Sequence, residues 1–434
     1  MAESTKTEVG SYFVSNYPPF SVWKPELVSE IEQTLNTPPQ PETPLGLYLH
    51  IPFCRKRCKF CYFKVFTEKN AKQIETYVSA LSREIELVSK LPVMGDRPFR
   101  FVYFGGGTPS FLSSKQLTSL VDRLRQNIDW DNAEEVTFEC EPGTLQEKKV
   151  HTLRELGVTR LSLGVENYTD SILEENGRAH LSKQVFQAWD WIKAADFPNV
   201  NIDLIAGMVG ETEANWKDNI RQAIEMSPES VTIYQMELPF NTVYSADILG
   251  NKIETPVADW QAKRDWVSYA FDEFQKAGYH ISSAYTVVKD PEKVNFSYRD
   301  NLWQGSDLLA TGIASFGHVN GVHYQNKSKW EDYVGDLENS ELPLGRAYRP
   351  SVHQALVREM ILQLKRGYLD SGYFKTKYNT DIQQQFKDAF AQHQSDGMLT
   401  VGPDRVELTR DGLLRVDSLL PAFFEPEHQG IRYT

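Results

Sequence analysis

Three of the four cysteines in this chain, Cys54, Cys58 and Cys61, lie within eight residues of one another, and the fourth is Cys140. Cysteine thiolates at such close spacing are typical ligands of an iron–sulfur cluster. Three thiolates ligate three irons of a [4Fe–4S] cube and leave the fourth iron open, whereas an electron carrier normally uses four. A reactant can bind at an open iron, so this spacing predicts a cluster that takes part in chemistry.

Three other interpretations of these thiols remain open. A structural zinc site needs four cysteine or histidine ligands, and the nearest histidine, His50, lies in a strand-like stretch four residues before Cys54. A disulfide is typical of secreted proteins, and the polar N-terminus of this chain does not resemble a secretory signal. The thiols could also be inert.

The composition describes an acidic globular protein. The chain has 434 residues, which is enough for one large and one smaller domain, and 41% of them are hydrophobic. The net charge of −13 argues against nucleic-acid binding, which needs a basic face. No stretch approaches the ~18 apolar residues of a membrane span, and unpaired cysteines fit a reducing compartment. We therefore expect a cytoplasmic protein without a membrane span.

A local basic patch interrupts the acidic chain next to the cysteines. It consists of Arg55, Lys56, Arg57 and Lys59. Such a patch could meet an acidic substrate or an acidic electron donor, or it could be a solvated loop.

Strand-like and helix-like stretches alternate from residue 45 onward, after a lead-in segment, 1–44, that is rich in proline and aromatic residues. The predicted strands are 45–51, 99–104, 135–139, 158–165, 199–207, 230–238 and 279–284. The predicted helices are 71–90, 113–128, 146–156 and 257–277. This alternation predicts a parallel sheet covered by helices. About six such units fall within 45–290, fewer than the eight of a closed barrel, so we predict an α/β fold with a partial (β/α)6 barrel.

The pattern changes in residues 291–434, which we predict to be a mostly helical C-terminal domain. An amphipathic helix is expected at 351–366, where Leu356, Met360 and Leu364 recur at helical spacing. The stretch 397–420 has the pattern strand, turn, strand, helix, which resembles a winged helix. In an acidic chain this shape favours a cover for a substrate over a DNA reader.

Glycines and charged residues stand at the ends of five consecutive predicted strands, where functional groups gather in parallel α/β folds. Glycines at 105–107 let a ligand approach the backbone closely. The acceptors Glu139, Glu166 and Asp203 suit hydroxyl groups or a positive charge, and Arg178 suits a carboxylate. Taken singly, the glycines could form a tight turn and the acids could be charges at the rim of the sheet.

The cysteine spacing resembles that of the radical S-adenosylmethionine (SAM) enzymes, which use a [4Fe–4S] cluster to reduce SAM to a 5′-deoxyadenosyl radical. Further motifs resemble the branch of this superfamily that holds the oxygen-independent coproporphyrinogen III oxidases, the heme chaperones derived from them and related methyltransferases. These motifs are Tyr48-x-His50-x-Pro52-Phe53-Cys54, Gly105-Gly-Gly-Thr-Pro109, Glu139-x-x-Pro-Gly-Thr144, Arg160-Leu-Ser-Leu-Gly-Val165, Gly177-Arg178-x-His180, Ile202-Asp-Leu-Ile205 and Tyr324-Gln-Asn326.

The resemblance implies a set of ligand-binding residues for the cluster and for SAM, with up to two SAM molecules per chain. The cluster ligands would be Cys54, Cys58 and Cys61. The SAM contacts would be Tyr48, Gly106, Gly107, Thr108, Glu139, Glu166, Arg178 and Asp203. The residues that fall where a second SAM is contacted are Phe60, Tyr62, Gln235 and Phe316.

Some positions depart from the branch. Glu166 stands where the family usually has glutamine, and Phe63 stands where the oxidases usually have one more cysteine. The chaperones usually carry a His-Asn-x-x-Tyr-Trp motif for heme, and the corresponding stretch here, 298–303, has no histidine. His318 and His323 could replace that heme ligand or could be hydrogen-bonded loop histidines.

Two main functions follow from the resemblance. The first is a radical SAM oxidoreductase of porphyrin metabolism that acts on a tetrapyrrole-type substrate, by oxidative decarboxylation or by methyl transfer, and takes electrons from an external one-electron donor such as a flavodoxin or ferredoxin. The alternative is a heme chaperone that binds heme and a [4Fe–4S] cluster and delivers heme to apoproteins. A third, weaker hypothesis is a cluster protein that binds SAM without turnover.

Overall fold

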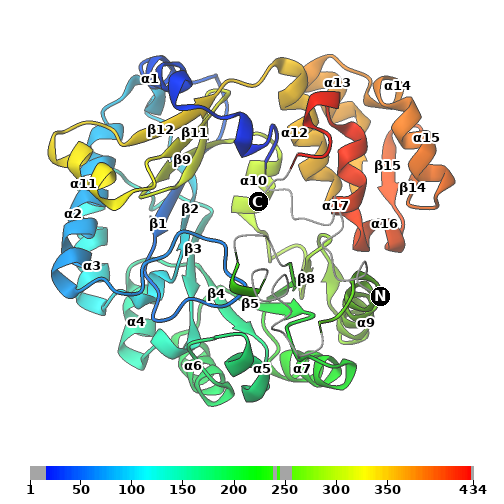
Figure 1. Cartoon of the computed structure of the whole chain (residues 1–434), viewed down its shortest axis with the longest axis horizontal. Coiled ribbons are helices and arrows are strands. Elements are labelled where there is room, and N and C mark those ends of the chain that lie inside the picture. Colours follow the sequence, from blue (N-terminus) through cyan, green and yellow to red (C-terminus); the bar gives the residue numbers. More distant parts are fainter. Residues whose placement is uncertain (1–15, 238–241, 245–256, 432–434) are drawn as a thin grey trace.

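A curved sheet forms the centre of the larger part of the molecule (Figure 1). The computed structural model describes residues 16–237, 242–244 and 257–431. Six neighbouring strands in these ranges pair in parallel and in chain order: β1 (Leu45–Ile51), β2 (Phe99–Gly106), β3 (Glu135–Cys140), β4 (Arg160–Glu166), β5 (Asn199–Ala206) and β6 (Ser230–Gln235). All six coincide with predicted strands, although residue 238 of the sixth prediction lies outside the described residues.

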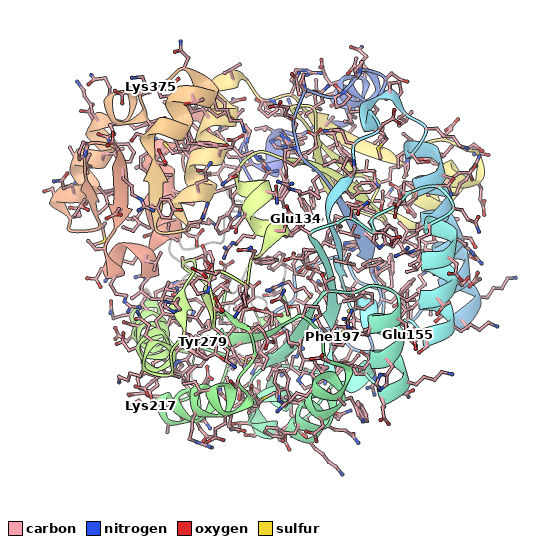
Figure 2. All side chains as sticks on the ribbon, turned by 180° about the vertical axis from the view of Figure 1, so that it is seen from behind. Glu134, Glu155, Phe197, Lys217, Tyr279 and Lys375 are labelled. Atoms are coloured by element: carbon pink, nitrogen blue, oxygen red, sulfur yellow. The ribbon has the colours of Figure 1, made fainter. Side chains whose placement is uncertain are left out.

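Helices follow the parallel strands and cover the outside of the sheet (Figure 1). They are α2 (Ala71–Val88), α3 (Ser114–Leu124), α4 (Glu147–Glu155), α5 (Asp170–Glu175), α6 (Ser182–Ala195), α7 (Glu213–Met226) and α9 (Trp260–Lys276). The predicted α/β class and the partial (β/α)6 barrel are therefore confirmed. Outward-facing residues of these helices, such as Glu155 and Lys217, point into solvent (Figure 2).

The sheet continues beyond the six parallel strands on both sides. Beside β1, it adds β9 (Asp307–Thr311), β10 (Phe316–Val319), β11 (Val322–Asn326) and β12 (Leu344–Tyr348), of which β9 is parallel to β1. Beside β6, it adds β8 (Thr286–Val288) and β7 (His280–Ile281). Because 307–348 belong to the same sheet as the barrel, the pairing favours a domain boundary near residue 350 over the predicted one at 290, and the division into domains stays a proposal.

The order of apolar residues explains how the helices attach to the sheet. In α2, Ile74, Val78, Leu81 and Ile85 recur at helical spacing and are at most 6% exposed. The side chain of Asn70 accepts a hydrogen bond from the Gln73 amide and caps the start of the helix. This cap fixes the end of the loop 52–70, which carries the three clustered cysteines.

The C-terminal part packs as a separate layer of helices with a small sheet (Figure 1). Its longest helix is α12 (Val352–Leu364), as predicted, and its sheet has the order β13-β15-β14. The strands are β13 (Tyr368–Asp370), β14 (Leu399–Val401) and β15 (Arg405–Leu408), and the helices are α13 (Ser371–Tyr378), α14 (Ile382–Gln385), α15 (Lys387–Ser395), α16 (Arg410–Leu414) and α17 (Val416–Leu419). The expected strand, turn, strand, helix order of 397–420 is thus present.

The lead-in segment contains a helix that the sequence analysis did not predict, α1 (Val28–Leu35). Its Ile31 and Leu35 pack against Val319 and Val322 of β10 and β11. Two further helices, α10 (Ser297–Trp303) and α11 (Trp330–Glu338), complete the larger part. Among the described helices, none has the length and apolar composition that crossing a bilayer requires.

A buried carboxylate joins the second helix to the extension of the sheet. Glu84 of α2 is 2% exposed and accepts hydrogen bonds from the Gly312 amide, the Asn326 amide group and the Tyr333 hydroxyl, at 2.6–2.8 Å. Burial is the main reason why the pKa of Glu84 rises to about 7.

We predict that Glu84→Ala destabilises the fold by about 3 kcal/mol, since each buried donor left unpaired costs about 1–3 kcal/mol. Guanidinium denaturation measures this free energy of unfolding. Glu86→Ala on the solvent side of the same helix is the control and should have little effect, because its ion pairs with Arg83 and Lys90 are exposed. Equal losses from the two variants would contradict the role of Glu84.

Candidate cofactor site

The three clustered cysteines lie in one loop at the C-terminal edge of the parallel sheet. The loop leaves β1 at Pro52 and is closed by two backbone bonds, from the Cys54 amide to the Phe66 carbonyl and from the Phe66 amide to the Pro52 carbonyl. All three thiols are partly buried, and burial raises the pKa of Cys54 to about 11, with the thiols of Cys58 and Cys61 adding to the effect. Within the described residues, no three acidic, histidine or cysteine side chains converge closely enough to hold a single metal ion.

The glycines after β2 form the wall against which the cysteine loop lies. The Gly107 amide donates to the Ile51 carbonyl at 2.9 Å. A Cβ at Gly107 would stand 2.9 Å from the Pro52 carbonyl carbon and 3.1 Å from Cys54 Sγ, so no side chain fits there. Thr108 Oγ1 donates to Cys54 Sγ at 3.4 Å. The glycines therefore let the second strand approach the cysteine loop directly.

Arg178 connects the cysteine loop to the end of β4. Its Nη1 donates to Cys58 Sγ at 3.3 Å and its Nη2 to the Gly164 carbonyl at 2.9 Å. The guanidinium also lies 3.5 Å from the Glu166 carboxylate. Its Nε is buried and has no hydrogen-bond partner among the described residues, which leaves one donor for a ligand.

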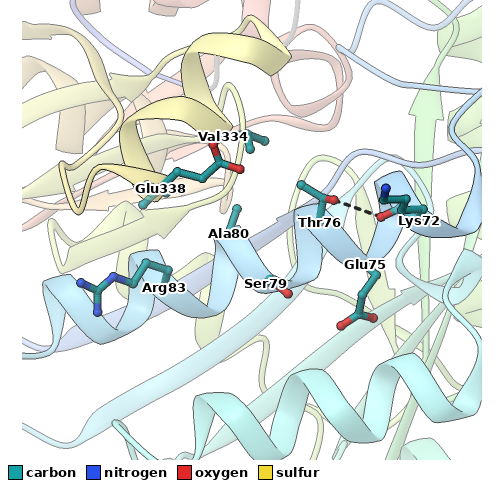
Figure 3. Close-up of a pocket in the computed structure, with 9 residues that line it drawn as sticks. Lys72, Glu75, Thr76, Ser79, Ala80, Arg83, Val334 and Glu338 are labelled. Carbon is teal, nitrogen blue, oxygen red and sulfur yellow. Dashed lines mark hydrogen bonds between the residues drawn. The ribbon is translucent and has the colours of Figure 1, made fainter.

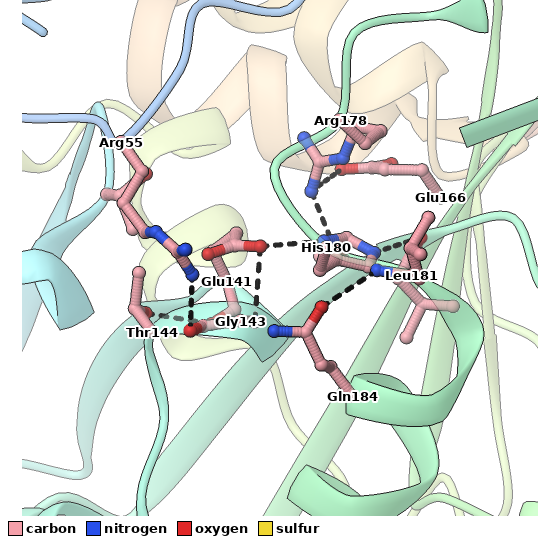
Figure 4. A network of polar contacts seen from close by, with 12 residues as sticks. Arg55, Glu141, Gly143, Thr144, Glu166, Arg178, His180, Leu181 and Gln184 are labelled. Carbon is pink, nitrogen blue, oxygen red and sulfur yellow. Dashed lines mark hydrogen bonds and ion pairs between the residues drawn. The ribbon is translucent and has the colours of Figure 1, made fainter. Parts of the chain in front are cut away.

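A second network, which the sequence analysis did not assign to the site, supports the same loop (Figure 4). His180 Nδ1 lies 2.7 Å from the Glu141 carboxylate, which also accepts from the Gly143 amide at 3.1 Å. Arg55 Nη1 donates to the Gly143 carbonyl at 2.7 Å. Burial alone would raise the pKa of Glu141, but the bond from His180 and the charge of Arg178 lower it below its usual range. The signals in the sequence were the places of His180 and Gly143 in quoted motifs and of Arg55 in the basic patch.

Three carboxylates stand at the ends of β3, β4 and β5. Tyr103 and the Gly106 amide donate to Glu139 at 2.7 and 3.2 Å, and Ser162 donates to Asp203 at 2.9 Å. Burial is the first cause of raised pKa values, to about 7 for Glu139 and Glu166 and to about 6 for Asp203. Repulsion from Asp203 adds to the shifts of Glu139 and Glu166, and repulsion from Glu139 adds to that of Glu166. A ligand with a positive charge would relieve this repulsion.

Glu166 reaches this position because the backbone bends there. It has a φ of 64°, and the pairing of β4 with β5 shifts register between Gly164 and Glu166. Such a bulge re-aims a side chain next to a functional site. A tyrosine wall lies near the same acids, with the rings of Tyr103 and Tyr298 4.3 Å apart and Tyr48 hydrogen-bonded to His50.

The four residues expected to contact a second SAM lie in different surroundings. Phe60 packs on the apolar cluster of Ile172, Ile205, Met208 and Met236. Tyr62 stacks on Phe63, and Gln235 Nε2 donates to the Leu414 carbonyl of α16 at 3.1 Å. Phe316 of β10 packs 4.2 Å from the ring of Phe20 in the lead-in segment. These contacts do not join the four residues in one cluster.

A groove of about 500 Å³ lies elsewhere, between α2 and α11 (Figure 3). It is lined by mixed charges such as Lys72, Glu75 and Glu338. None of the predicted site residues lines this groove, so it does not enter the functional argument.

Comparisons with known proteins agree with the fold. The model of the radical SAM superfamily matches residues 48–223. A heme chaperone, HemW, from Lactococcus lactis is 30% identical and covers 68% of this chain, which in turn covers 74% of that protein. An oxygen-independent coproporphyrinogen III oxidase from Synechocystis is 24% identical, with 94% of this chain and 91% of that protein covered. The solved coproporphyrinogen III oxidase HemN from Escherichia coli has the same fold, with a TM-score of 0.82, 22% identity, and coverage of 95% of this chain and 96% of that one.

An α/β barrel with three clustered thiols at the C-terminal edge of its strands thus defines the class of protein. The chain belongs to the radical SAM superfamily, in the branch of the oxygen-independent coproporphyrinogen III oxidases and the heme chaperone HemW. Membership implies a [4Fe–4S] cluster and SAM. The residues fit both groups, since three thiols share one loop, Arg178 keeps a free donor, and the buried acids suit the positive charges of SAM.

We predict that Cys54→Ala, Cys58→Ala or Cys61→Ala abolishes the cluster absorbance of anaerobically reconstituted protein, because the remaining two thiolates cannot hold the cube. Cys140→Ala is the matched control: its thiol is 4% exposed and packs in the hydrophobic core. Iron content and visible absorbance measure the outcome. Loss of the cluster in the Cys140 variant would overturn the ligand assignment.

We also predict that the affinity for SAM rises between about pH 6 and pH 8. The pKa values of Glu139 and Glu166, about 7, mean that these acids are partly protonated at the lower pH and attract a cation only when ionised. One unit of pKa shift on binding corresponds to about tenfold in affinity. Isothermal calorimetry with SAM tests this, and Glu166→Gln should flatten the profile; an unchanged profile would count against the acid ring as the cation site.

Proposed function

We propose that this chain is a radical SAM oxidoreductase that acts on a tetrapyrrole-type substrate. The observation that carries the proposal is the arrangement of three thiols, the Arg178 guanidinium and three buried acids at one edge of the parallel sheet. The names of the relatives support a porphyrin substrate. Oxidative decarboxylation and SAM-dependent methyl transfer are the two outcomes that we propose for such a substrate.

Each residue of the site has a role in this proposal. Cys54, Cys58 and Cys61 would hold the cluster, and the bound cluster and SAM would supply the one-electron chemistry that removes a hydrogen atom from the substrate. Arg178 places a positive charge beside Cys58, because its Nη1 donates to the Sγ atom of that ligand. Its free Nε is suited to a carboxylate of SAM.

The acids and glycines would bind the remaining groups of SAM. Glu139, Glu166 and Asp203 accept hydrogen bonds and carry negative charge, so they suit the ammonium, the sulfonium and the ribose hydroxyls. Gly106 and Gly107 let the nucleotide approach the backbone. Tyr48 is proposed as a further contact, together with Thr108. A second SAM near Phe60, Tyr62, Gln235 and Phe316 also remains a proposal.

The C-terminal part would cover the substrate. Gln235 donates to the Leu414 carbonyl of α16, and the Tyr285 hydroxyl donates to the Asp417 carboxylate of α17. These contacts hold the cover against the end of the barrel. Electrons would come from an external donor, such as a flavodoxin or ferredoxin.

A heme chaperone is the second candidate, and the 30% identity to HemW favours it. The histidine pair considered as a heme ligand does not support it. His318 Nδ1 lies 3.0 Å from His323 Nδ1, and His323 Nε2 lies 3.1 Å from the Tyr17 carbonyl. Both residues are on strands β10 and β11, and their bonds to each other and to the backbone occupy three of their four nitrogens.

We predict that reduced, reconstituted protein incubated with SAM and coproporphyrinogen III releases 5′-deoxyadenosine and a decarboxylated porphyrinogen. Chromatography with mass detection measures both products. Asp203→Asn should lower SAM cleavage about tenfold or more, because it removes one of the three acids while leaving the cysteines in place. A methylated product would support methyl transfer instead, and stoichiometric retention of heme without 5′-deoxyadenosine would replace the enzyme by the chaperone.

A further inference from the structure

A buried arginine lies at the seam between the sheet and the C-terminal helices without an acidic partner. Arg358 of α12 is 6% exposed, and its Nε donates to the Asn16 side-chain carbonyl at 2.9 Å. No carboxylate of the described residues forms an ion pair with it. A buried charge without a counter-charge costs folding free energy, so such a group is retained at a functional site or is paired elsewhere.

The neighbours of Arg358 do not neutralise it. The carboxylate of the adjacent Glu359 forms an ion pair with Lys377 at 2.7 Å and accepts a hydrogen bond from the Tyr373 hydroxyl at 2.6 Å. His318 and His323 face the arginine from β10 and β11, and burial first and the charge of Arg358 second keep their pKa values well below the usual range. Both imidazoles are therefore neutral, and the carboxylate of Glu359 attracts Arg358 without forming an ion pair with it among the described residues.

The histidine pair presents a hydrogen-bond acceptor beside this charge. The Tyr17 carbonyl can only accept, so His323 Nε2 carries the proton and donates to it. His323 Nδ1 then accepts from His318 Nδ1 at 3.0 Å. His318 Nε2 is left as an acceptor, and no described residue donates to it.

Flat aromatic surfaces lie next to the same seam. Trp23 stacks on His323, with ring centroids 4.9 Å apart and planes at 6°. Phe316 is 37% exposed and packs 4.2 Å from Phe20 and 5.8 Å from Trp23. In Figure 1 the start of the described chain, in dark blue, runs between β11 and α12.

We propose that Arg358 anchors a carboxylate of a flat, conjugated ligand, and that His318 Nε2 accepts a hydrogen bond from an N–H or O–H group of the same ligand. Guanidinium groups bind carboxylates through paired N–H donors. The inference rests on the proposed function and deepens it, because a tetrapyrrole with acidic side arms has this chemistry. SAM also combines a carboxylate with a flat ring, so the two sources must be separated by experiment.

The test compares the binding of coproporphyrin III, its tetramethyl ester and S-adenosylhomocysteine to reconstituted protein. Fluorescence quenching measures the porphyrins and calorimetry measures the nucleoside. We expect the unmutated chain to bind the free acid at least about tenfold more tightly than the ester, and Arg358→Met to remove that difference, since the ester cannot form the charged bond. If Arg358→Met weakens S-adenosylhomocysteine instead, the carboxylate site is upheld and its occupant is the nucleoside. Unchanged affinities for all three probes would overturn the proposal.

Stability without ligand separates this role from a structural one. If the ion-pair partner of Arg358 is a ligand, the arginine adds no folding free energy in the ligand-free protein. The melting temperature of Arg358→Met should therefore stay the same or rise. A clear fall would show that Arg358 has a partner inside the chain and would overturn the proposal. Arg349→Met is the matched control, because Arg349 pairs with Glu30 at 2.8 Å on the surface and should leave porphyrin binding unchanged.

The result of the binding test does not depend on whether the protein is an active enzyme. If porphyrin binding depends on the carboxylate but no 5′-deoxyadenosine forms, the proposed role of Arg358 stands and the proposed enzyme activity is wrong. If product forms but the free acid and the ester bind with equal affinity, the proposed enzyme activity stands and the proposed role of Arg358 is wrong.

Discussion

The site depends on the close packing of like charges at one edge of a parallel sheet. Glu139, Glu166 and Asp203 lie on three neighbouring strands, toward their C-terminal ends, and the fold holds them near enough for Asp203 to repel the other two. Because strands in a parallel sheet all end at the same edge, this proximity follows from the topology alone. The repulsion raises the electrostatic free energy of the ligand-free protein. A cationic ligand would remove this repulsion, which would add to its binding free energy.

The cysteine loop lies at the same edge of the sheet as the three acids. It begins where β1 ends and is closed by the bridge between Phe53 and Phe66, so the thiols face the strand ends without a regular element of their own. Gly107 brings β2 against Cys54, while Arg178 brings β4 to Cys58. Two strands of the sheet, β2 and β4, thus position one loop, and a change at any of these contacts shifts the thiols relative to the acids.

The sequence predicted the elements whose pattern is local. The apolar run of β1 and the period of α2 gave their positions to within two residues, and the strand ends gave the acids and the glycines. It did not predict α1, whose apolar face is fixed by β10 and β11 almost 300 residues later in the chain. It also placed β9–β12 outside the barrel, because short strands of mixed character carry no signal that they pair with β1. The bond between Glu141 and His180, and the isolation of Arg358, arise from packing between distant segments and so leave no periodic pattern.

Acidic and basic side chains are concentrated in different parts of the molecule. Acidic side chains lie on β3, β4 and β5, whereas the buried guanidinium of Arg358 lies at the seam where β10 and β11 meet α12 and forms no ion pair with a carboxylate of the described residues. A molecule with a cationic end and an acidic end would be aligned by these two fields before any close contact forms. The aromatic rings of Phe20, Trp23 and Phe316 add an apolar surface at the basic end only. Under the proposed function, the seam would take a flat acidic ligand and the strand ends a cationic nucleoside, so charge would separate the two kinds of ligand.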